Sequence, residues 1–166
     1  MKRIIVGSLE DAKRFRADGP YAVISFVGHW YHKTPPKLTR DPKRIARIVV
    51  RADDTYPGIA GTIALSDAQA DRIAAFVQRT AGEIDTLFIH CYFGHGRSCA
   101  AAIGIARAFH LNWQEFLEGD RVGNGHITLA VARAFERLGY SCSPDDAAAY
   151  DQLYLNHLEQ PADARR

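Results

Sequence analysis

The chain is poor in cysteine, lacks any long hydrophobic run and carries no strong excess of charge of either sign. Only three cysteines occur among 166 residues. An odd, low count argues against a disulfide framework and suits a reducing compartment, where a thiol stays free. A formal net charge of +2 is too small to indicate binding to nucleic acid or to a membrane. We therefore expect neither nucleic acid nor a membrane as a partner.

Long apolar segments are also lacking. No stretch reaches the roughly 20 apolar residues needed to cross a bilayer, and the apolar run near the first residue is too short for a signal peptide. We therefore expect a cytoplasmic protein. Internal repeats, low-complexity tracts and linkers are absent as well. The length fits one domain with a sizeable core, which we expect to span residues 1–166.

What the sequence does contain is an alternation of strand and helix patterns. Short apolar, β-branched runs predict strands at 4–6, 21–27, 45–50 and 86–89. Apolar residues at helical spacing, with capping residues, predict helices at 8–17, 66–82, 98–110, 113–117, 127–138 and 145–158. This alternation indicates an α/β fold, with a mainly parallel central sheet of four to five strands and helices on both faces.

The most informative segment, residues 90–98, joins the last predicted strand to the following helix. Its sequence is His-Cys-Tyr-Phe-Gly-His-Gly-Arg-Ser. Ligands of open α/β sheets bind at the carboxyl ends of the strands. A strand–loop–helix junction with two glycines also directs several backbone N–H groups at one point and so binds anions. We therefore expect a phosphate-binding loop at 90–98, with phosphate bound by Tyr92, Phe93, Gly94, His95, Gly96 and Arg97.

Two side chains give this loop its chemistry. Cys91 opens the loop, where the N–H groups and the dipole of the next helix favour a nucleophilic thiolate. Arg97 closes the loop, where a planar guanidinium can bind two phosphate oxygens at once. A bound phosphate would have the sulfur of Cys91 beneath its phosphorus. That geometry suits in-line attack and a cysteinyl-phosphate intermediate.

The pattern His90-Cys91-x-x-Gly94-x-x-Arg97-Ser98 resembles the signature of the cysteine-dependent protein tyrosine phosphatases. The small size resembles their compact dual-specificity branch. The resemblance implies that Cys91 attacks, that Arg97 stabilises the transferring phosphoryl group and that Ser98 assists departure of the thiolate. It also implies phosphotyrosine or phosphoserine/threonine of a protein as substrate, without a metal or a cofactor. We expect His90 to orient the loop.

This chemistry also needs an acid that protonates the leaving oxygen, and the family takes an aspartate from a loop upstream of the cysteine. Asp53 and Asp54 follow the third predicted strand, in a segment at about 51–62 whose glycines and proline would allow movement. On register we favour Asp54 and keep Asp53 as the alternative. Asn124 resembles, loosely, an asparagine before the late helix of dual-specificity relatives. It is expected either to support the site or to be a plain turn residue.

Three alternative functions stay open. A phospho-binding module would keep the anion nest without turnover. An enzyme of sulfur or arsenate chemistry would use a similar cysteine loop. A phosphatase of the same mechanism could instead act on a phosphoinositide or on the 5′-phosphate of RNA. Lipid-phosphatase relatives tend to carry lysines where this chain has Tyr92 and His95, which disfavours a lipid substrate.

Two further side chains invite hypotheses. Cys99 stands where the family often has glycine, and we interpret it as a small buried residue. A reversible disulfide between Cys99 and Cys91 is the competing hypothesis. Trp30 lies in the long proline-rich loop at 28–42, where it could pack that loop onto the body or stack on a phosphotyrosine ring.

Overall fold

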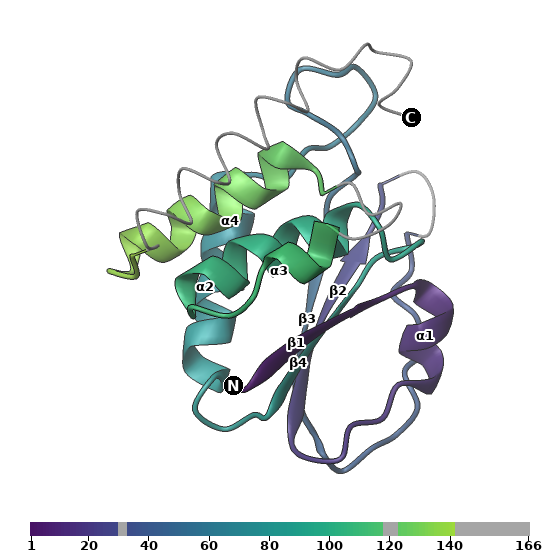
Figure 1. The fold of residues 1–166 in the computed structure, drawn as a ribbon. Coiled ribbons are helices and arrows are strands. Elements are labelled where there is room, and N and C mark those ends of the chain that lie inside the picture. The colour runs from purple at the N-terminus through teal and green to yellow at the C-terminus, as the bar shows by residue number, and fades with distance from the viewer. Residues whose placement is uncertain (30–32, 118–122, 142–166) are drawn as a thin grey trace.

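The computed structural model describes residues 1–29, 33–117 and 123–141, which build one sheet flanked by helices (Figure 1). The sheet consists of β1 (Arg3–Gly7), β2 (Tyr21–Val27), β3 (Arg44–Arg51) and β4 (Thr86–His90). Its order is β1-β4-β2-β3, and every pair of neighbours is parallel. The predicted parallel α/β sheet is confirmed, with four strands among the described residues.

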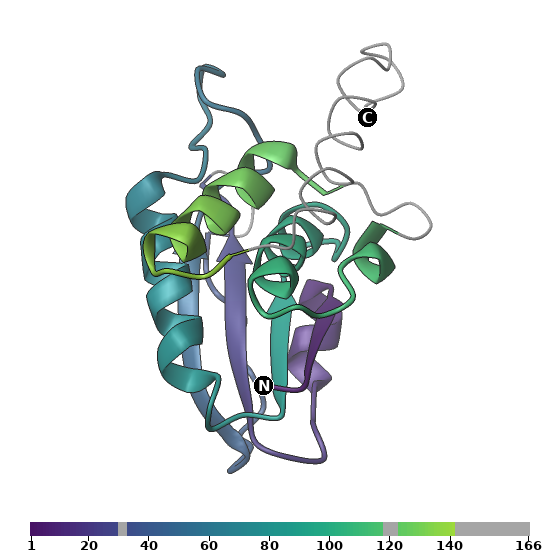
Figure 2. The same ribbon diagram turned by 60° about the vertical axis from the view of Figure 1, so that its left-hand side comes forward.

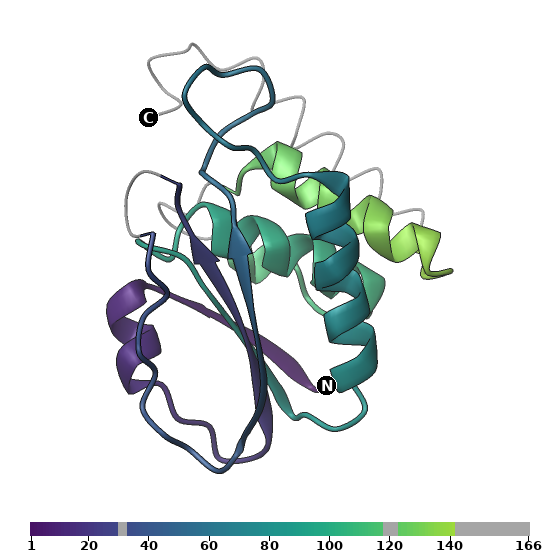
Figure 3. The ribbon, with the colours of Figure 1, turned by 180° about the vertical axis from the view of Figure 1, so that it is seen from behind.

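Helices cover both faces of the sheet, but unequally (Figure 3). One face is covered by α2 (Asp67–Thr80), α3 (Arg97–Ala108) and α4 (Gly125–Arg137). The other face carries the short helix α1 (Leu9–Arg14). In Figure 2, α3 and α4 lie in front of the sheet and α1 behind it. A single 3-10 turn, η1 (Gln114–Leu117), follows α3.

The central strand β2 is buried along its whole length, which suits its near-continuous apolar sequence. Successive side chains of a strand point to opposite faces. Ile24 and Phe26 therefore join the core under α2, α3 and α4. Tyr21 and Val23 pack in the smaller cluster under α1. Ser25 belongs to this second face by alternation and is fully buried, although it is polar.

Most of the apolar core lies between the sheet and the three long helices. All twelve residues of α3 are buried, which suits a helix rich in alanine and apolar on most of its sides. Burying one large apolar side chain contributes about 1.5–3 kcal/mol. This thick layer therefore supplies most of the stability that holds α3 against β4. The cluster on the α1 face is much smaller and contains Ala12, Ala17, Tyr21, Val23 and Phe88.

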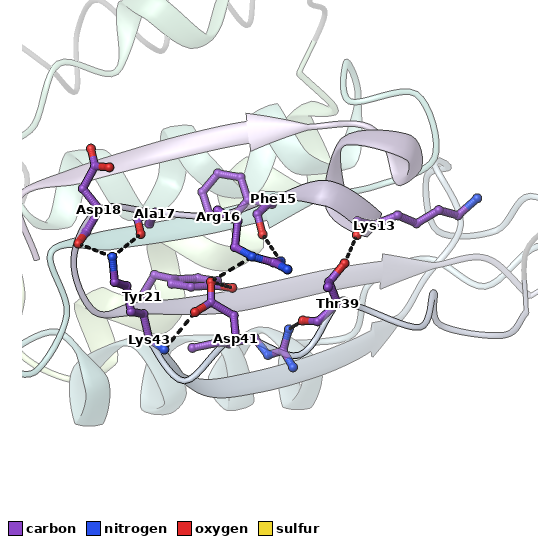
Figure 4. A network of polar contacts seen from close by, with 10 residues as sticks. Lys13, Phe15, Arg16, Ala17, Asp18, Tyr21, Thr39, Asp41 and Lys43 are labelled. Atoms are coloured by element: carbon purple, nitrogen blue, oxygen red, sulfur yellow. Dashed lines mark hydrogen bonds and ion pairs between the residues drawn. The ribbon is translucent and has the colours of Figure 1, made fainter.

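Polar contacts join α1 to the loop that precedes β3 (Figure 4). The hydroxyl of Thr39 donates to the carbonyl of Lys13 at 2.5 Å, and the hydroxyl of Tyr21 donates to Asp41 at 3.0 Å. Burial, together with the hydrogen bond to Asp41, raises the pKa of Tyr21. The phenol therefore stays a neutral donor, and it holds the loop at the amino ends of β2 and β3.

Three arginines of the edge strand β3 hold the loop at 33–42 against the sheet. The loop contains prolines, which cannot donate a backbone hydrogen bond. Side chains of β3 therefore supply the donors, and the loop runs back along the strand. The contacts are Arg44 to the carbonyl of Thr39 at 2.8 Å, Arg47 to that of Pro36 at 3.0 Å and Arg51 to that of Lys33 at 2.7 Å.

Some predicted elements differ in length from the observed ones. The helix predicted at 8–17 ends at Arg14, because Phe15 is extended and stacks its ring on that of Phe88, with the centroids 3.9 Å apart. The helix predicted at 113–117 is the 3-10 turn η1. The helix predicted at 145–158 and the side chain of Trp30 lie outside the described residues. No helix in the described ranges is long and apolar enough to span a bilayer.

Candidate active site

The sheet presents the cysteine loop at the carboxyl end of a central strand. β4 lies between β1 and β2 and ends at His90, and α3 begins at Arg97. Residues 91–96 form the connection, at the edge of the sheet where ligands of open α/β folds bind. The N-cap of α3 is Gly96, and no side chain caps this helix. The N–H groups of its first turn are therefore available to an anion, which the helix dipole favours.

The backbone of the loop is held by the segment that joins β1 to α1. The N–H of Leu9 donates to the carbonyl of Tyr92 at 3.0 Å, and the N–H of Cys91 donates to the carbonyl of Gly7 at 3.4 Å. Gly94 has φ of +86°, and a Cβ on it would lie 2.8 Å from the carbonyl carbon of Gly7. Only glycine fits at position 94, because both the positive φ and the close approach exclude a side chain.

The sulfur of Cys91 lies at the base of this loop. Sγ accepts a hydrogen bond from the N–H of Gly94 at 3.2 Å and lies 3.3 Å from the hydroxyl of Ser98. Both contacts can stabilise negative charge on the sulfur. Ser98 is fully buried, and its hydroxyl contacts this sulfur from the first turn of α3.

Arg97 lies beside the loop and is nearly buried, with 9% of the residue exposed. Nη1 donates to the carbonyl of Ala52 at 2.8 Å, which anchors the side chain to the end of β3. Nε is buried without a hydrogen-bond partner among the described residues. An unpaired buried donor is costly, and a phosphate oxygen is a ligand that would satisfy it.

Asp54 lies directly against the same loop. A Cβ built on Gly96 would lie 1.9 Å from Oδ2 of Asp54, so this carboxylate rests on the backbone of the cysteine loop. Oδ1 accepts a hydrogen bond from Nδ2 of Asn124 at 2.9 Å. The same amide also donates to the carbonyl of Thr55 at 3.3 Å. Asn124 further caps α4, because its Oδ1 accepts from the N–H of Ile127 at 3.2 Å. One side chain therefore ties Asp54 to a buried helix.

The carboxylate of Asp53, the neighbouring residue, accepts hydrogen bonds from backbone N–H groups instead. Oδ1 accepts from the N–H of His29 at 2.7 Å, and Oδ2 accepts from the N–H of Ile63 at 2.9 Å. The N–H of Asp53 also donates to the carbonyl of Ile63 at 2.7 Å. Both of its oxygens are thus occupied in closing the base of the loop at 52–65. This arrangement leaves Asp54 as the carboxylate that faces the cysteine loop.

His90 lies beneath the loop and is fully buried. Its Nε2 is 2.7 Å from the hydroxyl of Ser25, and its Nδ1 is 3.4 Å from the carbonyl of Cys91. Burial lowers the pKa of His90 to about 4, well below its ordinary value near 6.5. The imidazole is therefore neutral at physiological pH, and it contacts the loop backbone rather than the position of a substrate.

The remaining side chains of the loop form its outer rim. The ring of Tyr92 packs edge-on against that of Phe93, with the centroids 4.5 Å apart. Phe93 is 73% exposed, and His95 is exposed as well. These side chains therefore point away from the buried base of the loop, where the sulfur of Cys91 lies.

Cys99 is buried in the first turn of α3, as predicted, and its thiol donates to the carbonyl of Gly94 at 3.2 Å. Neither Cys91 nor Cys99 is joined in a disulfide in this structure. The described residues contain no group of three or more histidine, cysteine or acidic side chains that could hold a metal ion.

Some neighbours of the site were missed by the sequence analysis. Ala52 contributes only a carbonyl, to which Arg97 donates, and a main-chain contact leaves no mark on the sequence. Ser25, which contacts His90, was detectable, because it is a polar residue at the centre of an otherwise apolar strand. Arg47 donates to Ser25 at 2.9 Å, and nothing in its sequence neighbourhood points to that contact.

No family model matches the sequence, and no curated protein matches it. Solved structures match over most of the chain. Human DUSP28 shares 15% identity, with 82% of this chain and 93% of that chain covered and a TM-score of 0.54. The human tyrosine phosphatase-like serine/threonine/tyrosine-interacting protein shares 14% identity, with 82% and 92% covered and a TM-score of 0.55. PTPMT1 shares 12% identity, with 82% and 91% covered and a TM-score of 0.52. The chain has the fold of the cysteine-dependent dual-specificity and tyrosine phosphatases.

Proposed function

We propose that this chain is a phosphatase that hydrolyses phosphomonoesters through a cysteinyl-phosphate intermediate on Cys91. The observation that carries the proposal is the meeting of three groups at one loop. The sulfur of Cys91 lies at its base, an unpaired donor of Arg97 is buried beside it, and Asp54 rests on its backbone at Gly96. In the proposal, residues 1–166 form one phosphatase domain with a phosphate loop at 90–98 and an acid loop at about 51–62.

The first step transfers the phosphoryl group to sulfur. The thiolate of Cys91 attacks phosphorus, an S–P bond forms, and the bond to the ester oxygen breaks. Asp54 gives its proton to that oxygen, which leaves as a neutral phenol or alcohol. The loop N–H groups and the guanidinium of Arg97 stabilise the charge on the three equatorial oxygens. Asn124 holds Asp54 in place through its amide.

The second step returns the enzyme to its starting state. Asp54, now a carboxylate, takes a proton from a water molecule that attacks phosphorus, and the S–P bond breaks. The thiolate that departs is stabilised by the hydroxyl of Ser98, which lies 3.3 Å from the sulfur. Inorganic phosphate leaves, and Asp54 is again protonated.

The proposed substrate is phosphotyrosine in a protein, with phosphoserine or phosphothreonine as the alternative. The exposed ring of Phe93 and the adjacent ring of Tyr92 at the mouth of the loop suit a flat aromatic leaving group. A phosphoinositide is the second candidate, because PTPMT1 has been crystallised in complex with PI(5)P and covers 82% of this chain with a TM-score of 0.54.

The decisive experiment compares the purified protein with Cys91→Ser on an aryl phosphate. We expect the wild type to release the phenol and Cys91→Ser to show no detectable turnover, because a hydroxyl is a far poorer nucleophile than a thiolate. Calorimetry with tungstate, a phosphate analogue, should give similar affinities for both proteins. Cys142→Ser, the same change at another position, should keep full activity.

Three outcomes would count against the proposal. Near-full turnover by Cys91→Ser would refute the intermediate. Tungstate binding by a wild type that lacks turnover would favour the phospho-binding module, a role suggested by the name of the tyrosine phosphatase-like interacting protein. Activity on thiosulfate or arsenate alone would favour the sulfur or arsenate enzyme. If the protein is active, its rates on phosphotyrosine peptides, phosphoserine peptides, PI(5)P and RNA 5′-phosphate then rank these substrates.

A further inference from the structure

A chain of buried polar groups runs beneath the phosphate loop across three neighbouring strands. Nε of Arg47, on β3, donates to the hydroxyl of Ser25, on β2, at 2.9 Å. That hydroxyl lies 2.7 Å from Nε2 of His90, at the end of β4. Nδ1 of the same imidazole lies 3.4 Å from the carbonyl of Cys91. This series of hydrogen bonds therefore links the half-buried side chain of Arg47 to the carbonyl of Cys91, at the start of the loop.

The direction of each hydrogen bond in this chain follows from donor and acceptor chemistry. A guanidinium has only donors, so the oxygen of Ser25 must accept from Arg47. The hydroxyl of Ser25 then has one proton left to donate. His90 is neutral because burial lowers its pKa to about 4, so one of its nitrogens carries a proton and the other accepts.

The two tautomers of His90 fit this arrangement very differently. With the proton on Nε2, both His90 and Arg47 would donate to the oxygen of Ser25, and the lone pair on Nδ1 would face the carbonyl oxygen of Cys91. Among the described residues, no other acceptor is then bonded to the hydroxyl proton of the fully buried Ser25. With the proton on Nδ1, Ser25 donates to Nε2 and Nδ1–H donates to the carbonyl. The hydroxyl of Ser25 and both ring nitrogens of His90 are then paired, as buried polar groups usually are.

We propose that Arg47 and Ser25 are positioning residues that hold His90 in the tautomer with the proton on Nδ1. In that form His90 donates to the carbonyl of Cys91 and keeps this oxygen turned toward the core. A carbonyl turned into the loop would place negative charge beside the thiolate and beside a bound phosphate. The tautomer is a claim about the folded protein alone, whereas its effect on turnover rests on the proposed phosphatase function.

The edge strand offers a matched control for Arg47. Arg47 has a second role, because its Nη1 donates to the carbonyl of Pro36 and so anchors the loop at 33–42. Arg44, on the same strand, anchors that loop through the carbonyl of Thr39. The guanidinium of Arg44 donates to this loop carbonyl and forms no hydrogen bond with Ser25 or His90. Arg44→Met therefore tests the loop anchor alone, and Arg47→Met tests the anchor together with the tautomer.

The direct test is long-range 1H–15N NMR of the histidine rings at pH 7, with the signals of His90 assigned by their loss in His90→Gln. The wild type and Arg44→Met should both show a protonated Nδ1 and an unprotonated Nε2. Ser25→Ala and Arg47→Met should shift the population toward a proton on Nε2. Arg47→Lys, which keeps a donor without an acceptor, should restore the wild-type pattern at least in part.

A second measurement follows Cys91 itself through its rate of alkylation by iodoacetamide between pH 4 and 9, read by mass spectrometry of its peptide. Ser25→Ala and Arg47→Met should each move the midpoint to higher pH and lower kcat/KM by roughly tenfold at pH 6. Their effects should not add in the double variant, because both act through His90. Arg44→Met should leave the midpoint unchanged.

A proton on Nε2 in the wild type would overturn the proposal, and so would an unchanged tautomer in Ser25→Ala with intact folding by circular dichroism. Equal midpoint shifts in Arg44→Met and Arg47→Met would assign the effect to the loop anchor instead. A protein without phosphatase activity still yields the tautomer. Failure of the proposed function is therefore distinguishable from failure of this inference.

Discussion

The two loops that meet at the candidate site are held by different means. The cysteine loop lies between a central strand and a helix whose twelve residues are all buried, and its backbone is bonded to Gly7 and Leu9. The loop at 52–65 leaves its apolar side chains Ile59 and Ile63 exposed, and a Cβ on its glycine at position 61 would meet nothing within 4 Å. It is held mainly where it begins, by Asp53 and by Asn124.

This difference fits the separate tasks that we propose for the two loops. An anion nest works only if its N–H groups keep one direction, and close packing against the core enforces that direction. A group that first gives and then takes a proton needs its carboxylate in place but not a rigid loop around it. Two polar contacts to Asp54 and Asp53 can supply that placement without burying the rest of the segment.

The largest expected effect is on the free energy of unfolding, when one glycine in each loop is replaced by alanine. Gly94→Ala should lower the free energy of unfolding by about 3 kcal/mol, because alanine is strained at a φ of +86° and its Cβ would overlap the backbone of Gly7. Gly61→Ala has a similar φ of +76° but open space around it, so about 1 kcal/mol is expected. Urea unfolding measures both. Equal losses would mean that the two loops do not differ in packing.

The next prediction separates the two neighbouring carboxylates. Asp54→Asn should reduce kcat/KM by about a hundredfold for an alkyl phosphate, whose leaving group needs the proton, and by much less for an aryl phosphate with a good leaving group. Asp53→Asn should reduce both rates by similar, smaller factors and lower the melting temperature, because it loosens the contacts with His29 and Ile63. A leaving-group dependence in Asp53→Asn but not in Asp54→Asn would reassign the acid.

The smallest expected effect is the pH dependence of the free energy of unfolding that His90, beneath the cysteine loop, causes. The folded pKa of His90, about 4, lies below the unfolded value near 6.5. Between these two pH values the unfolded chain therefore binds more protons than the folded protein. The stability that the neutral His90 contributes is fully present above pH 6.5 and is lost as the pH falls toward 4. Between pH 7 and pH 5 the loss from this group should be about 2 kcal/mol.

His90→Gln supplies the control for this pH dependence, because it removes the titrating group and leaves the other histidines in place. Urea unfolding at pH 7 and pH 5 should show a smaller pH-dependent loss in the variant than in the wild type. An equal loss in both proteins would mean that His90 is not the buried neutral group on which the packing of the phosphate loop depends.

Local patterns were enough to predict the strands and the start of the cysteine loop. β2 matches its predicted bounds, because a near-continuous apolar run of this length, rich in β-branched residues, is typical of a strand buried on both faces. α2 begins at Asp67, after the capping residue Ser66 that its sequence displayed. The helix predicted at 8–17 was too long. The backbone leaves the helical conformation at Phe15, whose ring stacks on that of Phe88.

The partners of the loop were harder to predict. Asp53 and Asp54 are identical and adjacent, so only the fold decides which carboxylate turns to the backbone of Ile63 and which to Gly96. Asn124 reaches Asp54 across 70 positions of sequence, which no local pattern encodes.

The sequence by itself determined the order of strands and helices and the run of groups from 90 to 98, because periodicity, capping and glycine spacing act between residues close along the chain. Only the tertiary structure decided which carboxylate faces the loop and that Arg47 and Ser25 lie behind His90. These contacts join strands and loops that are distant in sequence, and they form because the parallel sheet places β3, β2 and β4 side by side.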